Sequence, residues 1–357
     1  LDVSGGKGDY DVSLNEFATV QIDEAINGAL AGAVDFKNAP DTFTLDVASK
    51  AKTNGDFAVG QTIAVTGKDY TGTTAKGTAE TFTLVAMMHD GNKDDTADGN
   101  IDANTVTVAG VENLVVEANT ATLDGGTKAL KASAHTLTAS IVATEAETLT
   151  VKGDASVDLS GVSDIGVVTK VDASGSTGNV TVNLSKQGNS VAYSGSDGVD
   201  TYTASASGDT IYTDMGADVV TLGAVRDTFV LKAATDSQVT DTSKDGKITL
   251  GADTGWDVIN GFVTGGAGAA DRIDLTNLSF SGAQRGVADV TAKVSATTDL
   301  TSVVDLFDSV AGDRGVAFST VAGTAVVFVD YNKDGDFTAA DDIVIQLTGG
   351  PTIAEAD

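Results

Sequence analysis

The sequence contains no cysteine among its 357 residues, so disulfide bonds, thiolate metal sites and thiol catalysis are excluded. Proline occurs only twice and tryptophan once. Basic side chains are also few, because 21 Lys and Arg stand against 51 Asp and Glu, for a formal net charge of −30. Such a chain lacks the cationic surface that nucleic acid or anionic lipid requires. No apolar run approaches the roughly 18 residues of a membrane helix, so we expect no membrane insertion.

Glycine is abundant, at 41 residues, and Ala, Thr, Val and Asp are the other common residues. This composition predicts many short strands separated by turns. Within residues 1–104, alternating segments at 42–47, 61–66 and 80–86 suggest a small β-sandwich or sheet module. Between 105 and 235, strands followed by small polar turns recur. They predict coils that share one core when stacked, with a β-sandwich as the alternative.

A nine-residue period organises the stretch from Gly195 to Phe229. Aspartate recurs at 200, 209, 218 and 227, and an apolar residue follows each one two positions later. The first unit is close to the nonapeptide G-G-x-G-x-D-x-U-x of calcium-binding β-helices. Glycine allows the tight turn, aspartate supplies the oxygen that Ca²⁺ prefers, and the apolar residue enters the core. The candidate calcium ligands are Asp197, Gly198, Asp200, Asp209, Asp214, Gly216, Asp218 and Asp227. The alternative is an ordinary run of Asp-rich turns.

Three further loops follow the D-x-[DNST]-x-[DN]-G logic of a calcium loop, in which alternate oxygen ligands converge and glycine permits the sharp bend. The third, at 330–341, matches best and has Asp in place of the closing Glu. A solvated acidic hairpin is the alternative for each loop. The candidate ligands are Asp94, Asp98 and Asn100 in the first loop; Asp241, Ser243, Asp245 and Asp253 in the second; and Asp330, Asn332, Asp334, Asp336 and Asp341 in the third.

Two stretches predict helices. Residues 299–312 place Leu300, Val303, Val304 and Phe307 on one helical face, with Asp299 as the N-cap. A second, short helix is predicted from Glu16 to Ala31. We also expect a strand at 248–250 after the second loop, and strands at 324–329 and 343–347 on either side of the third. Residues 236–357 would therefore form a β-rich C-terminal cap with one convincing helix.

The order of these segments over roughly residues 105–357 resembles the C-terminal part of calcium-binding RTX proteins exported by type I secretion, in particular surface-layer proteins of the Caulobacter type. The resemblance rests on Val168 to Gly175, the nonapeptides from Gly195, the predicted helix near Leu300, and the strands before and after the third loop. It implies secretion through a channel, folding outside the cell in calcium, and assembly into a surface lattice. Separately, the start at Leu1 without a signal peptide leads us to expect that this chain is a piece of a longer precursor.

These observations predict an all-β fold, a parallel β-helix or β-solenoid with RTX-like coils between an N-terminal β module and the C-terminal cap. We expect an extracellular, Ca²⁺-stabilised structural protein that assembles with copies of itself, with cell-surface polysaccharide as a further partner. An adhesin or biofilm-matrix protein that binds glycans is the alternative. An enzyme is not expected, because neither H-E-x-x-H nor G-x-S-x-G occurs.

Overall fold

The computed structural model describes part of the chain, in separate segments. They are residues 8–11, 19–23, 33–48, 57–67, 80–89, 100–121, 135–161, 164–239, 243–250, 253, 255–265, 270–280, 287–295, 298–307, 315–321, 323–349 and 351. The chain divides into two compact units, one formed by residues 1–192 and 196–198, the other by residues 193–195 and 199–357.

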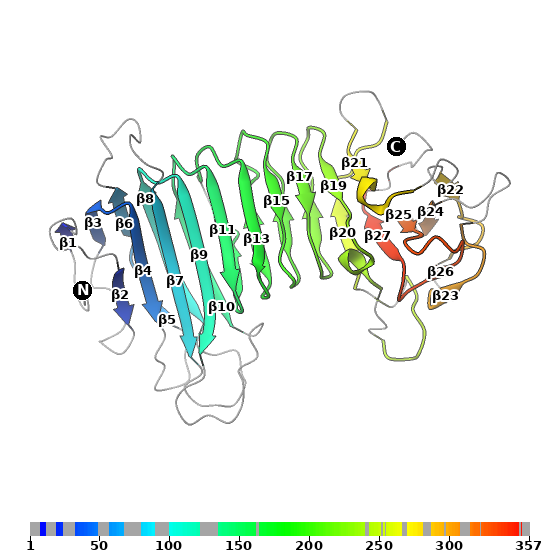
Figure 1. The fold of residues 1–357 in the computed structure, drawn as a ribbon, viewed down its shortest axis with the longest axis horizontal. Helices are drawn as coiled ribbons and strands as arrows, with labels where there is room; N and C mark the ends of the chain where they lie inside the picture. Colours follow the sequence, from blue (N-terminus) through cyan, green and yellow to red (C-terminus); the bar gives the residue numbers. More distant parts are fainter. Residues whose placement is uncertain are drawn as a thin grey trace. The chain divides into compact units, whose positions relative to one another are not determined.

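The first unit is a parallel β-helix, as predicted for the fold class (Figure 1). One of its sheets has the strand order β1-β3-β6-β8-β10-β12-β14, and the other has the order β2-β4-β7-β9-β11-β13. The strands are β1 (Gly8–Asp11), β2 (Thr19–Asp23), β3 (Val34–Ala39), β4 (Thr42–Ala48), β5 (Phe57–Ala58), β6 (Ile63–Gly67), β7 (Thr81–His89), β8 (Ile101–Ala109), β9 (Asn113–Ala121), β10 (Thr136–Val142), β11 (Thr148–Gly153), β12 (Ser156–Leu159), β13 (Lys170–Ser176) and β14 (Val180–Asn183).

The core of this unit comes from alternation along each strand. Side chains of a strand point in turn to the two faces of its sheet, so every second residue is buried. Phe43 pairs with Phe82 on the next coil, and the two rings stack with centroids 6.3 Å apart. Leu45 pairs with Leu84 in the same way, and both side chains are buried. Like residues therefore form ladders through the coils.

Three expectations for the N-terminal half need correction. The module at 1–104 is not a sandwich, because β3, β4, β6 and β7 pair in parallel as successive coils. The boundary expected at residue 104 falls inside β8 (Ile101–Ala109). Residues 19–23 of the predicted helix form a strand, since Val20 and Ile22 are buried at a spacing of two.

The second unit continues with shorter coils and then changes architecture. Its sheets have the orders β16-β18-β20-β27-β25-β24-β22 and β15-β17-β19-β21, and β23 pairs with β26. β15 (Ala192–Ser194) lies at the division between the units. The other elements are β16 (Thr201–Thr203), β17 (Thr210–Tyr212), β18 (Val219–Thr221), β19 (Thr228–Val230), η4 (Ala234–Ser237), β20 (Asp257–Asn260), β21 (Arg272–Asp274), η5 (Thr276–Leu278), β22 (Val287–Asp289), β23 (Ser302–Val303), β24 (Val316–Val321), β25 (Thr324–Val329), β26 (Phe337–Thr338) and β27 (Ile343–Leu347).

The nine-residue period of the sequence corresponds to half a coil. Tyr202 of β16 pairs with Val220 of β18, and Ile211 of β17 pairs with Phe229 of β19, so partners lie 18 residues apart. Each of these three-residue strands buries its central side chain. Successive apolar residues of the period therefore fill the narrow core from opposite sheets.

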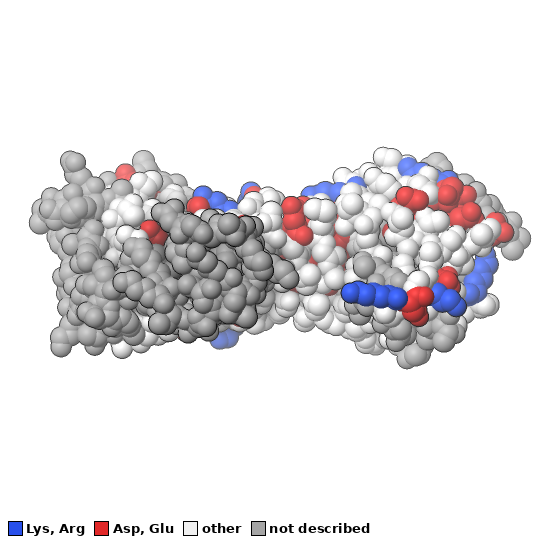
Figure 2. Space-filling view, turned by 90° about the horizontal axis from the view of Figure 1, so that it is seen from below, with Lys and Arg blue, Asp and Glu red and all other residues white. Residues whose placement is uncertain are grey.

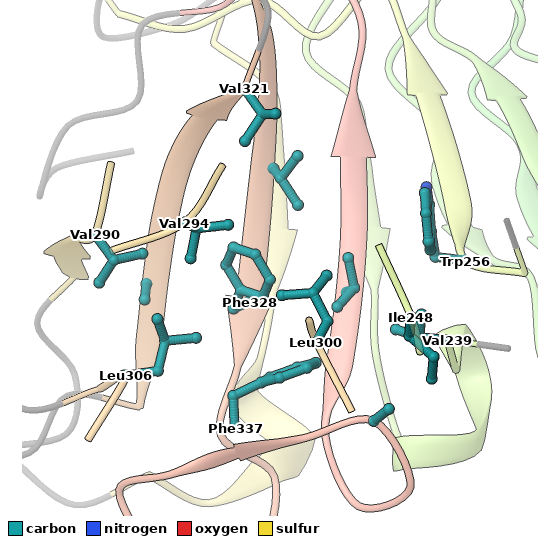
Figure 3. Packing of buried hydrophobic residues seen from close by; sticks show 14 of the residues in the cluster. Val239, Ile248, Trp256, Val290, Val294, Leu300, Leu306, Val321, Phe328 and Phe337 are labelled. Carbon is teal, nitrogen blue, oxygen red and sulfur yellow. The ribbon is translucent and has the colours of Figure 1, made fainter. Parts of the chain in front are cut away.

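The C-terminal cap folds around its own hydrophobic cluster (Figure 3). The predicted strands β25 and β27 pair in antiparallel fashion there, and β24 pairs with the other edge of β25. Phe328 and Phe337 meet edge to face at 5.3 Å, beside Leu300, Leu306 and other buried side chains. This cluster gives the cap a core separate from the coil interior.

The helix predicted at 299–312 is wrong over its described part, residues 299–307. Ser302 and Val303 form β23, which pairs with β26. Val304, which the helical stripe would bury, is 67% exposed. Asp299 accepts a hydrogen bond from the N–H of Thr301 in a local turn and caps no helix. The β-branched residues here have low helix propensity, and pairing with β26 satisfies their backbone instead. The strand predicted at 248–250 is also absent, although Ile248 is buried.

Candidate metal centres

Buried aspartates line the turns of the second unit, and a buried carboxylate needs hydrogen-bond donors or a cation. They are Asp200, Asp209, Asp218, Asp227, Asp236, Asp257 and Asp271. The four predicted from the nine-residue period are among them, each directly before a strand of the stack. Asp236, Asp257 and Asp271 were not predicted, and for Asp257 and Asp271 the reason is that insertions interrupt the period after residue 230. Asp236 alone of the three keeps the nine-residue spacing, as it follows Asp227 by nine residues.

These carboxylates link each coil to the coil before it. In one column, the N–H of Asp200 donates to Oδ1 of Asp218 at 2.7 Å, and the N–H of Asp218 donates to Oδ1 of Asp257 at 3.0 Å. In the other column, the N–H of Asp209 donates to Oδ1 of Asp227 at 2.7 Å. The N–H of Asp227 donates in the same way to the next carboxylate of that column, at 2.8 Å. The columns therefore satisfy turn N–H groups that the sheets leave unpaired.

The second carboxylate oxygen usually takes donors from its own turn. Tyr193 and Tyr202 occupy two of the apolar positions, and their hydroxyl groups donate to Oδ2 of Asp200 and Asp209, both at 2.8 Å. Oδ2 of Asp227 accepts the N–H of Gly223, four residues earlier, at 2.8 Å. Protein donors thus occupy oxygens that the nonapeptide pattern assigns to calcium.

Asp218 is the exception. Its Oδ2 is buried and has no hydrogen-bond partner. Ile211 stands seven residues before it, at the position from which tyrosine donates in the two preceding units, and an isoleucine has no hydroxyl. Burial, reinforced by the neighbouring Asp257 carboxylate, raises the pKa of Asp218 to about 10. The pKa of Asp257 is also raised, and burial is again the main cause.

The remaining nonapeptide candidates do not join these columns. Asp197 is exposed. Gly198 lies against Gly178, where a Cβ would come within 2.7 Å of backbone carbon. Asp214 and Gly216 both have positive φ, of 66° and 140°, and shape the turn before Asp218. Calcium at these coils stays a prediction.

The loop at 330–342 has the backbone of a tight ligand loop. Lys333 and Gly335, its fourth and sixth residues, have φ of 66° and 87°. Asp330 is 1% exposed, and its two oxygens accept the N–H groups of Lys333 and Gly335, at 2.5 and 3.1 Å. Asn332 and Asp334 hydrogen-bond to each other on the exposed side. The left-handed residues turn the chain sharply and bring the alternate polar side chains to one loop.

The carboxylate that closes this loop is Asp342 and not the predicted Asp341. Asp341 is exposed and accepts a hydrogen bond from the hydroxyl of Thr338, whereas Asp342 is fully buried. The Oδ1 of Asp342 accepts the N–H of Tyr331 at 2.9 Å, and its Oδ2 accepts the N–H of Thr338 at 2.8 Å. Burial raises its pKa to about 6. Asp342 thus ties the start of the loop to its end.

The second loop repeats this design. Lys244 and Gly246, again at positions four and six, have φ of 59° and 83°. Asp253 lies twelve residues after Asp241, as Asp342 lies twelve after Asp330, and this shared spacing could have identified Asp342 from the sequence. The Oδ2 of Asp253 accepts the N–H of Thr249, four residues earlier, and its Oδ1 accepts the N–H of Ser243.

The other predicted loop ligands are placed as follows. Asp245 is exposed, with its Oδ1 accepting the N–H of Lys247, and Asp336 accepts the N–H of Asp305. Asp94, Asp98 and Asp241 lie outside the described residues. Asn100 is described, and its side-chain oxygen accepts the N–H of Thr136 on the next coil at 2.8 Å.

Within the described residues, no group of three or more His, Asp or Glu side chains converges closely enough to hold a metal ion. The third loop nevertheless fits a hard cation by chemistry. It supplies oxygen donors, and the exposed side chains of Asn332 and Asp334 can reach an ion without unpacking the core. Comparison of the sequence with known protein families and with curated proteins finds no match. None of the described helices is long and apolar enough to cross a membrane.

Proposed function

We propose that this protein is an extracellular structural protein of the bacterial surface-layer type, stabilised by Ca²⁺ and assembled from copies of itself. The observation that carries the proposal is the pair of loops at 241–253 and 330–342. They share their residue spacing, the two left-handed positions and the buried closing aspartate. Two loops of one design in one unit favour a common ligand, and an oxygen-only donor set favours Ca²⁺.

The stacked coils support a structural role. In each unit, successive coils share hydrophobic ladders, so neighbouring coils stabilise each other as in other repeat proteins. His135, the one histidine whose side chain is described, is 1% exposed. It is therefore badly placed to act on a substrate as an acid or base.

The charge of the chain supports assembly that depends on calcium. A net charge of −30 repels other copies in chelator, and monovalent salt only screens that repulsion. Ca²⁺ can also bridge carboxylates of two molecules by coordination. On the face drawn in Figure 2, acidic side chains of the described residues lie interspersed with basic ones, so bridging would act at local acidic sites.

The test is assembly measured by light scattering during a calcium titration, followed by electron microscopy of the product. We expect monomers in EGTA and sheets or large oligomers in millimolar Ca²⁺. NaCl at equal ionic strength should not reproduce the effect. Particles that remain monomeric throughout would contradict the lattice and favour the glycan-binding alternative.

A further inference from the structure

A cavity of about 690 Å³ opens beside β21 in the second unit, within the range of sites that bind small ligands. β21 is the last strand of its sheet, so no described strand covers its outer edge. The cavity wall combines one cation with hydroxyl groups and apolar side chains. It includes Thr228, Arg272, Thr276, Ser279, Phe280 and Val316.

Arg272 is the chemically distinctive group of the cavity. It is exposed and pairs in register with Thr228 of β19, so both lie on neighbouring strands at one wall. Among the described residues its guanidinium forms no ion pair. Asp274, the acidic residue of the same wall, already uses one oxygen to accept the N–H of Thr276 at 2.9 Å. Arginine can hold a planar carboxylate through two parallel hydrogen bonds.

A second cation reinforces the positive character of this wall. Lys333 donates from Nζ to the backbone oxygen of Ser279 at 3.3 Å, and its Nζ lies 5.6 Å from the centre of the Phe280 ring. Both contacted residues line the cavity. In a chain with 51 acidic and 21 basic side chains, two cations beside one carboxylate form an unusual local environment. An anionic ligand fits it better than a cationic one.

We propose that this cavity binds a carboxylate-bearing sugar of a polysaccharide. Arg272 holds the carboxylate, and the hydroxyls of Thr228, Thr276 and Ser279 exchange hydrogen bonds with the hydroxyls of the sugar. The ring of Phe280 contacts the apolar face of the sugar. This role is separate from the assembly proposed above, since the residues that line the cavity lie outside the calcium loops. Only Lys333, which contacts Ser279 and Phe280 from nearby, belongs to the loop at 330–342.

The test is binding of an oligogalacturonate of three sugars to the full chain, measured by calorimetry. The fully methyl-esterified trisaccharide is the matched ligand control, because it has nearly the same shape without the charge. We expect the acid form to bind at least tenfold more tightly than the ester. Arg272→Gln should weaken binding of the acid form by about tenfold or more, the scale of a lost charge-assisted pair. The affinity of Arg272→Lys for the acid form should lie between that of the wild type and that of Arg272→Gln.

Lys186→Gln is the control variant, because Lys186 is exposed and lies outside the cavity. It removes one positive charge and should leave binding unchanged. Circular dichroism of each variant establishes that the fold is intact. Equal binding of acid and ester, or unchanged binding by Arg272→Gln, would overturn the proposal. Displacement of the trisaccharide by equimolar inorganic phosphate would also overturn it, since the cavity would then recognise a simple anion. None of these outcomes bears on calcium-dependent assembly.

Discussion

Asp218 shows how missing hydrogen-bond donors change the chemistry of a buried carboxylate. Asp200 and Asp209 each receive a tyrosine O–H. At Asp227 the tyrosine position holds Val220, but the N–H of Gly223 supplies the donor instead. Asp218 has Ile211 at that position and keeps an orphan oxygen. With a pKa raised to about 10, the group is protonated at neutral pH. A protonated Asp218 next to Asp257 avoids two adjacent buried charges.

We therefore predict opposite behaviour for two isosteric substitutions in chelator at pH 7. Asp218→Asn should raise stability at pH 7, because the wild-type carboxyl ionises when the chain unfolds at this pH and thereby favours the unfolded state, whereas the amide does not titrate. Asp227→Asn should cost about 1–3 kcal/mol, because both oxygens of Asp227 accept N–H groups and an amide nitrogen cannot. Denaturant unfolding measures the stability of each variant against the wild type.

The pH dependence separates the variants further. A raised folded-state pKa favours the folded state below the unfolded value and loses this contribution as pH rises towards the folded value. The stability of Asp218→Asn relative to the wild type should therefore increase as pH rises from about 4 to about 10. If the stability difference between the variant and the wild type stayed constant across this pH range, Asp218 would be ionised in the folded protein.

The tyrosines of the stack provide a second prediction at this scale. Tyr202→Phe removes the hydroxyl that donates to Asp209 but keeps the ring, which stacks on Tyr193 with centroids 4.2 Å apart. We expect a loss of about 1 kcal/mol, because Asp209 retains the N–H of Ser205. Tyr331→Phe, at an exposed tyrosine, is the control and should have no measurable effect on the melting temperature.

At the scale of the element, the third loop separates stability from ion binding. Asp342→Asn should destabilise the protein even in EGTA, by about 1–3 kcal/mol, because Asp342 closes the loop from a buried position. Asp334→Ala should leave stability in EGTA nearly unchanged, since Asp334 is exposed, but should reduce the stabilisation that Ca²⁺ gives. Melting curves with EGTA and with Ca²⁺ check both. An unaltered calcium response of Asp334→Ala would argue against a metal at this loop.

The segment at 299–307 offers a test of its extended structure. Val304→Lys should be tolerated within about 0.5 kcal/mol, because this side chain is exposed. Phe307→Ala should cost about 3–5 kcal/mol, because Phe307 is fully buried in the hydrophobic cluster of the cap. A helix over this segment would bury both residues, so comparable losses at the two sites would restore the helical interpretation.

At the scale of the whole molecule, buried acids set the response to pH. Burial raises the pKa of Asp227 and of Asp342 to about 6. Their contribution to stability is complete below about pH 4 and is lost as pH rises towards 6. In EGTA we therefore expect the melting temperature to rise when pH falls from 7 to 5. A fall over this interval would mean that these carboxylates are stabilised as anions.

Carboxylates also link coils in the first unit. The N–H of Glu80 donates to Glu112 at 2.7 Å, and the N–H of Thr120 donates to Asp154 at 2.7 Å. Each acceptor lies on the following coil, as in the columns of the second unit. Acidic residues thus serve as internal hydrogen-bond acceptors within both units, and the acidic composition is in part a requirement of the fold.

The sequence by itself determined the fold class and the position of the coils in the stretch with the nine-residue period. A nine-residue period with one apolar residue per unit can bury that residue only when successive turns stack, and period-two alternation specifies strands. The spacing of Asp and Gly likewise located the loops predicted at 241–253 and 330–341, since local turn chemistry suffices for a tight bend. These features depend on neighbours within a few residues of each other.

Only the tertiary structure decided what the carboxylates contact. The N–H groups of Asp218 and Asp227 donate to Asp257 and Asp271, which lie 39 and 44 positions later, and this alignment depends on how many residues each coil inserts. Spacing along the sequence cannot reveal this alignment. The stretch at 299–307 matched a helical pattern, yet its strand forms against β26, more than 30 residues away. Long-range pairing and burial outweighed local propensity there, because they satisfy backbone groups and remove apolar surface from water together.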